Sequence, residues 1–294
     1  MNHTLTFDIE DWFHIMEIPE LEDRSNWNDF DSIVEDKTSL ILDILEEYDT
    51  KATFFILGWI AKKYPGLSVK IADGGHEIAT HSFWHRRVYE MDREDFRHDL
   101  SLSVDLLEQQ TGQKVKGFRA PSFSITPGTE WAFDVIRELG LIYDASLFPA
   151  SRGHGGYPCP QQIHTIPLTT ADEHLFEIPM SVQGFGSVKM PFSGGGYLRL
   201  LPSFVIQRFF NLFEKDNNPV VVYLHPRDFA PGQPRINMPL DRKFKSYVGL
   251  NSTENKLRDL LNTYNFGTCL NVLIQELKKR PNAEKEKKLL ELAF

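Results

Sequence analysis

Short apolar segments alternate with longer amphipathic segments along this chain, and the alternation predicts its fold. Apolar segments such as 52–57 (ATFFIL) and 219–224 (PVVVYL) have the length of buried strands. Amphipathic segments such as 38–48 and 93–110 repeat their apolar residues at helical spacing. Because helices that join strands of one sheet form parallel crossovers, this pattern indicates an α/β fold with parallel strands. Further strands are expected at 5–8, 77–80, 115–119, 141–143 and 176–179, and further helices at 59–72, 127–139, 202–214, 253–264 and 270–279.

Glycine, proline and polar residues mark the segments between these elements. Segment 151–170 is rich in such residues and is expected to be a loop. Three consecutive glycines at 194–196 indicate a tight backbone segment. Segment 226–247 is expected to be irregular, and the charged tail at 284–292 is expected to be helical or frayed.

Ionisable residues follow five of the predicted strands, at the point where each strand ends. They are Asp8, His81, Arg119, Asp144 and His225. In α/β barrels the carboxyl ends of the strands meet at one face, and that face carries the active site. The sequence therefore predicts a site at which these five side chains converge.

Two of the strand ends carry residues that suit a metal ion. His81 and His85 are four positions apart, which places both imidazoles on one face of a helical turn. Asp8, Glu10 and Asp11 put three carboxylates within four residues, and a bound cation offsets their repulsion. Two imidazoles and one carboxylate leave a coordination position for water, as in catalytic zinc sites. The alternatives are a solvated acidic loop or helix cap and a pair of ordinary buried histidines.

The other strand ends suggest proton transfer. Arg119 is placed to hold Asp8 by a two-pronged hydrogen bond, although a surface ion pair of little energetic value is the alternative. His225 ends an apolar strand and is a candidate proton donor, although a hydrogen-bonded buried histidine is an equally good interpretation.

Composition and charge exclude several classes of protein. The chain has 294 residues, of which 41% are hydrophobic and 25% charged, as is typical of soluble globular proteins. The formal net charge of −9 gives no basic surface for nucleic acid and disfavours an anionic membrane surface as a partner. We expect one domain over residues 1–294, with 226–294 as a C-terminal extension packed on the barrel.

No targeting signal is recognisable in the sequence. Its first residues (MNHTLTFDIEDW) lack the basic and apolar regions of a signal peptide, and no apolar stretch is long enough to span a membrane. Two cysteines, Cys159 and Cys269, suit a reducing compartment better than a disulfide scaffold. A cytoplasmic location is therefore expected, and an oligomer is possible.

Taken together, these residues resemble the polysaccharide deacetylase family, also called the NodB-homology or carbohydrate esterase 4 family. The resemblance runs from about Thr6 to about Arg227, and five motifs occur in the order that the family has. The first motif departs from the usual adjacent Asp pair and is similar to the branch of helicobacter-type peptidoglycan deacetylases and exopolysaccharide-cluster deacetylases. The motifs are T-F-D-I-E-D at 6–11, H-S-F-W-H at 81–85, R-A-P at 119–121, D-A-S at 144–146 and L-H at 224–225.

The resemblance implies a fold and a reaction. The fold is a distorted (β/α) barrel of seven parallel strands, with irregular loops and C-terminal helices. The reaction is metal-dependent removal of an acetyl group from an N-acetylated sugar of a polysaccharide or its precursor. One divalent ion per chain, expected to be zinc, is held by His81, His85 and either Glu10 or Asp11, with Glu10 slightly favoured.

The resemblance also assigns roles around that ion. Asp8 is the catalytic base, oriented by Arg119, and His225 protonates the leaving amine. Asp144 or Glu177 holds His225 in its protonated form, and a backbone N–H near Ser122 or Phe123 stabilises the oxyanion. Trp12, Trp84 and Phe123 are candidate walls of a groove for sugar rings, with barrel packing as the alternative, and His14 and Glu17 are weaker candidates for substrate contact.

Two other functions fit the same residues. The first is another amide hydrolase on this barrel, of the type that opens cyclic ureides, and some enzymes of that type work without metal. The second is a catalytically inactive carbohydrate-binding barrel, which has no need of the base Asp8 and the acid His225. The expected partner is an acetylated glycan or sugar precursor.

Overall fold

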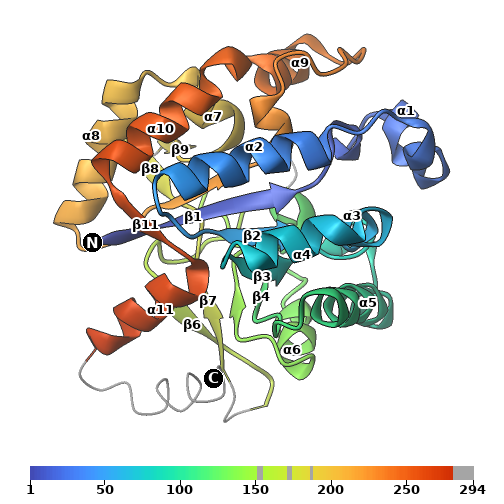
Figure 1. Ribbon diagram of the computed structural model, residues 1–294. Coiled ribbons are helices and arrows are strands. Elements are labelled where there is room, and N and C mark those ends of the chain that lie inside the picture. The colour runs from blue at the N-terminus through green and yellow to red at the C-terminus, as the bar shows by residue number, and fades with distance from the viewer. Residues whose placement is uncertain (151–154, 171–173, 186–187, 281–294) are drawn as a thin grey trace.

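A mixed sheet curls through the centre of the computed structural model, which describes residues 1–150, 155–170, 174–185 and 188–280 (Figure 1). Seven of its strands pair in parallel in one unbroken series, which confirms the predicted α/β barrel with seven parallel strands. In spatial order these strands are β10 (Val221–Leu224), β1 (Asn2–Ile9), β2 (Thr53–Ile56), β3 (Glu77–Thr80), β4 (Gly117–Phe118), β5 (Tyr143–Asp144) and β7 (His174–Glu177).

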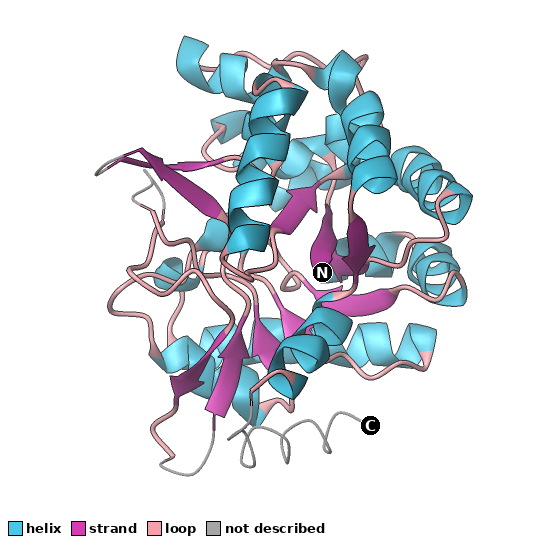
Figure 2. Cartoon of the chain, turned by 90° about the vertical axis from the view of Figure 1, so that its left-hand side faces the viewer, coloured by secondary structure: helices cyan, strands magenta, loops and turns pink. Residues whose placement is uncertain are grey.

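Four further strands complete the β-structure. The antiparallel strand β6 (His164–Pro167) pairs with β7, so the loop expected over 151–170 contains a strand. Local sequence misses β6 because the pairing with β7, in which Ile166 lies opposite Leu175, supplies its stability. The short strand β11 (Asn265–Gly267) pairs with the start of β1. A separate hairpin of β8 (Val182–Phe185) and β9 (Val188–Pro191) projects from the body of the molecule (Figure 2).

Helices cover the outside of the sheet on the side that faces away from the barrel interior (Figures 1 and 2). The helix expected over 59–72 is divided in two, because Pro65 lacks an N–H and restricts the residue before it. The described helices are α1 (Pro19–Glu22), α2 (Val34–Glu47), α3 (Gly58–Lys63), α4 (Pro65–Asp73), α5 (Arg93–Thr111), α6 (Trp131–Glu138), α7 (Gly195–Leu200), α8 (Ser203–Lys215), α9 (Leu240–Tyr247), α10 (Thr253–Thr263) and α11 (Cys269–Lys278).

Three of these helices, the four-residue α1 and the longer α7 and α9, lie where the sequence predicted none. The triple glycine at 194–196 opens α7, and Gly195 adopts a φ of 49°. The segment expected to be irregular at 226–247 ends in α9, whose apolar and basic residues repeat at helical spacing. The charged tail at 284–292 lies outside the described residues. No described helix is both long and apolar enough to cross a membrane.

Strand β1 shows how the barrel aims its polar residues. Leu5, Phe7 and Ile9 are buried in the layer between the sheet and the helices, where Phe7 stacks on Phe54. Because successive side chains of a strand point to opposite faces, Thr6 and Asp8 point into the barrel. Inside the barrel, the Asp8 carboxylate meets Arg119, whose guanidinium lies 4.1 Å from the centroid of the Phe55 ring. The alternation of β1 thus delivers Asp8 to the interior at the carboxyl end of the sheet.

Candidate active site

A cavity of about 230 Å³ opens at the carboxyl ends of β1, β3 and β10. Three of the five strand-end residues, Asp8, His81 and His225, line it directly. Arg119 is buried behind the wall and reaches Asp8, whereas Asp144 does not line the cavity. The wall also includes Glu10, His14, Ile15, Met16, Glu17, His85, Arg87, Ala120, Ser122, Phe123, Tyr223 and Arg242.

Glu10, His81 and His85 form a buried group that has the composition of a metal site. One ligand atom from each residue lies within 4.8 Å of the other two. The Glu10 Oε2 atom is 2.6 Å from Nε2 of His85. Burial would raise the pKa of Glu10, but the three neighbouring histidines outweigh it and hold the pKa below its usual range. The carboxylate is therefore ionised and directed at the two imidazoles.

The two histidines meet through a loop, and the helical turn expected from their spacing is absent. Ser82 and His85 have φ values of 66° and 54°, in the left-handed region, so the segment after β3 cannot continue as a helix. The Asp99 carboxylate of α5 accepts hydrogen bonds from the backbone N–H groups of Phe83 and Trp84, at 2.7 and 3.1 Å. This contact with a distant helix fixes the loop, and the spacing of the histidines alone could not reveal it.

The ring of His81 is oriented by the backbone of the next strand. Its Nδ1 lies 2.8 Å from the carbonyl oxygen of Arg119, and a carbonyl can only accept, so Nδ1 carries the proton. Burial lowers the pKa of His81 to about 4. The imidazole is thus neutral at neutral pH, and its Nε2 lone pair is available to a ligand.

Asp11, the alternative third ligand, is engaged elsewhere. Its carboxylate accepts hydrogen bonds from Ser32 Oγ and from the backbone N–H groups of Trp12 and Ile33. It caps the short 3-10 helix η1 (Trp12–His14) and ties it to the start of α2. Among the described residues, Glu10 is the carboxylate grouped with His81 and His85.

The Asp8–Arg119 pair is buried inside the barrel. The Arg119 Nη1 atom lies 2.7 Å from Asp8 Oδ1 and 2.8 Å from Thr6 Oγ1, while Nε donates to the carbonyl of Ala145 at 3.1 Å. The contact with Asp8 therefore has one prong, and the two-pronged arrangement expected from the sequence is absent. Because Arg119 occupies Oδ1, the other carboxylate oxygen of Asp8 is left facing His225, whose Nε2 is 3.8 Å away.

His225 takes its support from Asp228, a residue that the sequence-based predictions did not include. The Nδ1 of His225 lies 3.0 Å from Asp228 Oδ2, and the Nε of Arg199 lies 3.1 Å from Asp228 Oδ1. Burial would lower the pKa of His225, but the hydrogen bond and charge of Asp228 outweigh it and raise the pKa. The spacing H-P-R-D at 225–228 is a local capping pattern and was visible in the sequence.

Asp144 and Glu177, the expected partners of His225, form a separate pair. Asp144 accepts a 2.5 Å hydrogen bond from Ser146 Oγ, and that hydroxyl in turn accepts the N–H of Ala120 at 2.7 Å. Glu177 accepts the N–H of Leu147 at 3.0 Å. Burial raises the pKa of both carboxyl groups. Asp144 is thus corrected from a catalytic candidate to a residue that ties the ends of β4 and β5 together and so places Arg119.

Replacing Glu177 by Gln is expected to flatten the pH dependence of stability. A raised pKa in the folded state means that this pair stabilises the fold below the unfolded values of about 4, and that the stabilisation is lost as pH rises through the folded values. Gln offers Asp144 an amide donor at every pH. Thermal unfolding at about pH 5 and about pH 8 should show a larger drop in Tm for the wild type than for Glu177→Gln. Equal drops in Tm for the two proteins would contradict the raised pKa values of Asp144 and Glu177.

Of the three aromatic candidates, Trp12 lies in the core and Trp84 is partly buried against it. Trp12 is 5% exposed, packs against Phe13 and Phe30, and donates its indole N–H to the carbonyl of Asp31. Trp84 packs against Phe83 and does not line the cavity. Trp12 is thus corrected from a substrate contact to a packing residue, and Trp84 lies outside the cavity lining, since motif proximity does not show which way a ring points. Phe123 does line the cavity, beside Tyr223.

The rim of the cavity contains charged residues from distant parts of the chain. Glu17 has a φ of 60°, and its carboxylate lies 2.8 Å from Nη1 of Arg242 and 3.5 Å from Nη1 of Arg87. Arg242 also donates to the carbonyl of Met16 at 2.6 Å. Glu17 and His14 were weak candidates in the sequence and both line the cavity. Arg242 lies 225 residues from Glu17, so no local pattern announces this pair.

Comparison with known proteins divides the chain into two matched segments. Residues 20–142 match the polysaccharide deacetylase family, and residues 145–274 match a domain of unknown function, DUF3473. A peptidoglycan-N-acetylglucosamine deacetylase of Bacillus cereus is 33% identical over 119 residues, which cover 36% of this chain and 43% of that protein. A chitooligosaccharide deacetylase of Azorhizobium caulinodans is 35% identical over 108 residues, covering 35% of this chain and 49% of that protein. The matches thus span less than half the length of both relatives.

Solved structures share the fold over nearly the whole chain. A putative polysaccharide deacetylase from Mycobacterium smegmatis superposes with a TM-score of 0.60 at 21% identity, covering 91% of this chain and 88% of that one. The Puue allantoinase superposes with a TM-score of 0.61 at 13% identity, covering 92% of this chain and 87% of that one. At these identities the likeness establishes the barrel architecture.

Proposed function

We propose that this chain, whose residues 20–142 match the polysaccharide deacetylase family, is a member of that family and removes an acetyl group from an N-acetylated sugar of a glycan with the help of a divalent metal ion. One observation carries the proposal. The Glu10–His81–His85 group, the Asp8–Arg119 pair and the His225–Asp228 pair all meet at a single cavity. Such a site combines the ligands, the base and the acid that amide hydrolysis needs.

Glu10, His81 and His85 would hold the ion. Two imidazole nitrogens and one carboxylate oxygen are the donor set of catalytic zinc sites, in which the remaining coordination position takes water or substrate. The orientation of His81 by the Arg119 carbonyl is the kind of outer support that such ligands have. When bound, an ion of this kind lowers the pKa of water and polarises a carbonyl oxygen.

Asp8 accepts a proton in this reaction and His225 donates one. The Asp8 oxygen that Arg119 leaves unoccupied accepts the proton of the attacking water, and the buried guanidinium holds the carboxylate in place through Oδ1. His225, which Asp228 holds protonated, donates from Nε2 to the nitrogen of the leaving amine. The backbone N–H of Phe123 already bonds to the carbonyl of Ala120, so the N–H of Ser122 is the candidate donor to the developing oxyanion.

The substrate class follows from the relatives and the cavity. The two relatives named above are a peptidoglycan-N-acetylglucosamine deacetylase and a chitooligosaccharide deacetylase, so an N-acetylated hexosamine is the expected reacting unit. Phe123 and Tyr223 supply aromatic surface beside the reacting groups, where a sugar ring can pack.

Acetate release tests the proposal directly. The purified chain, loaded with Zn²⁺, should release acetate from N-acetylated chitooligosaccharides, lose that activity on chelation and recover it when Zn²⁺ is restored. Allantoin serves as the substrate of the competing ureide hydrolysis. Turnover of allantoin without acetate release would favour that function, and full activity after exhaustive chelation would contradict the metal assignment.

A further inference from the structure

The four most exposed large apolar side chains of the described residues gather on three neighbouring helices. Leu240 is 84% exposed and Phe244 56% exposed, and they lie one turn apart on α9. Phe204, at the start of α8, is 72% exposed, and Leu200, at the end of α7, is 48% exposed. Helices α7 and α9 pack against each other. These four residues are called the apolar patch below.

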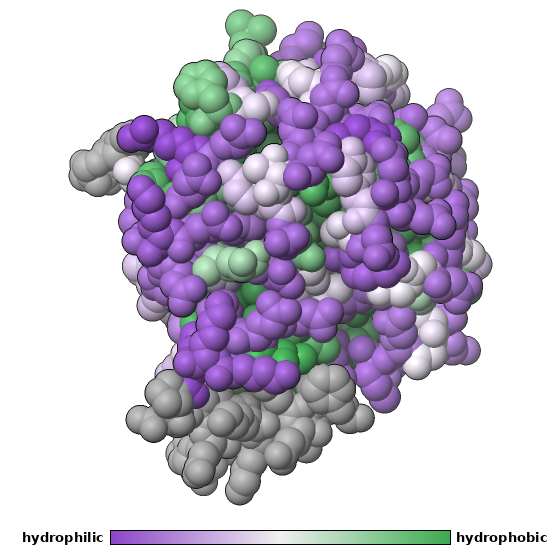
Figure 3. Space-filling model, turned by 60° about the vertical axis from the view of Figure 1, so that its left-hand side comes forward, coloured by the Kyte–Doolittle hydropathy of each residue, from purple (hydrophilic) through white to green (hydrophobic). Residues whose placement is uncertain are grey.

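The space-filling view agrees with this grouping. In Figure 3 the face is largely hydrophilic, and green side chains protrude at the top of the molecule, at the height of α7 and α9 in Figure 1. Other large apolar side chains that reach the surface, such as Leu102 at 38%, are less exposed and lie apart from the patch. A Leu and Phe cluster exposed to this degree marks a surface that is covered by something else.

Basic residues surround the apolar patch without acidic partners. Lys243 and Lys245 alternate with Phe244 on α9, and Arg208 follows Phe204 by one turn on α8. Arg235 lies beside them, with its guanidinium 4.2 Å from the centroid of the Tyr247 ring. All four basic side chains are exposed, and none forms an ion pair with a carboxylate in the described part of the chain. Although the whole chain has a net charge of −9, the charged side chains that are described on α9, which are Arg242, Lys243 and Lys245, are all basic.

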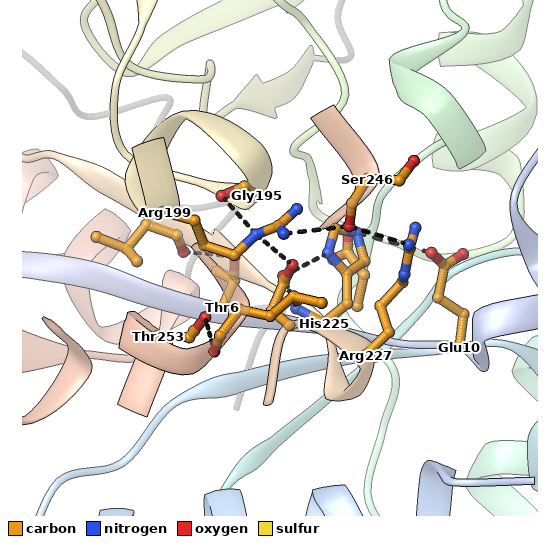
Figure 4. Close-up of polar contacts among 12 residues, drawn as sticks. Thr6, Glu10, Gly195, Arg199, His225, Arg227, Ser246 and Thr253 are labelled. Carbon is orange, nitrogen blue, oxygen red and sulfur yellow. Dashed lines mark hydrogen bonds and ion pairs between the residues drawn. The ribbon is translucent and has the colours of Figure 1, made fainter. Parts of the chain in front are cut away.

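The apolar patch borders the opening of the active site. Arg242, which lies between Leu240 and Phe244 in α9, lines the cavity and binds Glu17. Arg199 holds the C-terminal end of α9 by donating to the carbonyls of Lys245, Ser246 and Val248 (Figure 4). The Nε of Arg199 also pairs with Asp228. A surface that covers the patch would therefore lie next to the cavity mouth.

We propose that α9 and the ends of α7 and α8 dock this protein on a lipid bilayer that carries anionic headgroups. An amphipathic helix with Phe and Leu on one side and Lys and Arg beside them has the pattern of a helix that lies in a membrane interface. Docking would insert Leu240, Phe244 and Phe204 among the acyl chains and pair Lys243, Lys245 and Arg208 with headgroup phosphates. The overall negative charge argued against such a surface, but binding depends on the local field within a Debye length.

The charge of the patch favours an anionic lipid bilayer over a second copy of the chain as its partner. A symmetric dimer through the patch would place the same surface on itself, so Lys243, Lys245 and Arg208 would face their own counterparts. The sequences of α7, α8 and α9 contain two acidic residues, Asp241 and Glu214, and Glu214 lies at the far end of α8 from Phe204. A negatively charged lipid surface complements the patch, whereas a second copy repels it.

Vesicle co-sedimentation of the full chain tests the proposal without reference to catalysis. We expect binding to phosphatidylcholine vesicles that contain about 30% phosphatidylglycerol, little binding to pure phosphatidylcholine, and weaker binding as salt is raised. Reversing Lys243 and Lys245 to Glu should lower the partition coefficient roughly tenfold or more. The double variant Leu240→Ser with Phe244→Ser should lower it by a similar factor.

Leu102→Ser is the matched control, because it removes an exposed apolar side chain outside the patch. It should bind the anionic vesicles as the wild type does, and all variants should keep the wild-type Tm. The proposal is overturned if the wild type does not bind anionic vesicles, if neutral vesicles bind equally well, or if the patch variants bind unchanged. A dimer in light scattering that the Leu240→Ser, Phe244→Ser variant dissolves would assign the patch to self-association and overturn it as well.

Discussion

Asn in place of Asp8 is expected to lower kcat for acetate release by about a hundredfold to ten-thousandfold, which is the range for loss of a general base. The Asn side-chain oxygen can still accept the 2.7 Å hydrogen bond from Nη1 of Arg119, so the buried guanidinium keeps a partner. What the variant loses is the oxygen that accepts the proton from water. Steady-state kinetics on an N-acetylated chitooligosaccharide, at matched metal occupancy, measures the effect.

Metal content is the control for this variant. Asp8 lies outside the Glu10–His81–His85 group, so Asp8→Asn should bind about one equivalent of Zn²⁺, as the wild type does. A kcat near the wild-type value would remove Asp8 from the role of base. A loss of metal along with activity would show instead that Asp8 belongs to the ligand set.

Ala in place of His81 is expected to abolish both metal retention and acetate release. This change removes a direct ligand, so metal affinity should fall by more than the roughly 10–100-fold that loss of an outer-shell partner costs. Burial keeps the His81 imidazole neutral and its Nδ1 is tied to the Arg119 carbonyl, so its Nε2 lone pair is available to the ion, and Ala offers no nitrogen in its place. The zinc content after gel filtration and the rate of acetate release should both fall to background.

Asp11→Asn is the matched comparison for His81→Ala. Asp11 carries the competing carboxylate of the same segment, but it is bonded to Ser32 and to the backbone of Trp12 and Ile33. The Asn variant should therefore keep its zinc and most of its activity, with any cost appearing as a lower Tm. Retention of stoichiometric zinc by His81→Ala, or its loss in Asp11→Asn, would reverse the ligand assignment.

The fold was largely predictable because each parallel strand has its own local signal. Strands such as β2 and β10 are apolar on both faces, and the helices between them carry a periodic pattern. Four strands were missed, β6, β8, β9 and β11, and each pairs with a neighbouring strand, as β6 does with β7. The helix α9 follows a segment rich in prolines and polar residues. These elements draw their stability from tertiary contacts, which periodicity does not report.

The positions of site residues at strand ends were predictable from the sequence, whereas those set by the conformation of a loop were not. Asp8 and Arg119 meet because β1 and β4 both open toward the same face. The path of 81–85 depends on Asp99, which lies on a helix farther along the chain. The partner of His225 expected from the sequence was Asp144 or Glu177, and Asp228 was not considered, although its three-residue spacing from His225 was visible.

The contact between Arg199 and α9 bears on how this surface can diverge among related sequences. Arg199 recognises α9 through the main-chain carbonyls of Lys245, Ser246 and Val248, and these groups are the same whatever side chains the helix carries. The exterior of α9 is therefore free to drift in composition while Asp228 and His225 stay in register beneath it. Substitutions at the outward-facing positions of α9 are therefore expected to change what this helix binds without displacing Asp228 and His225.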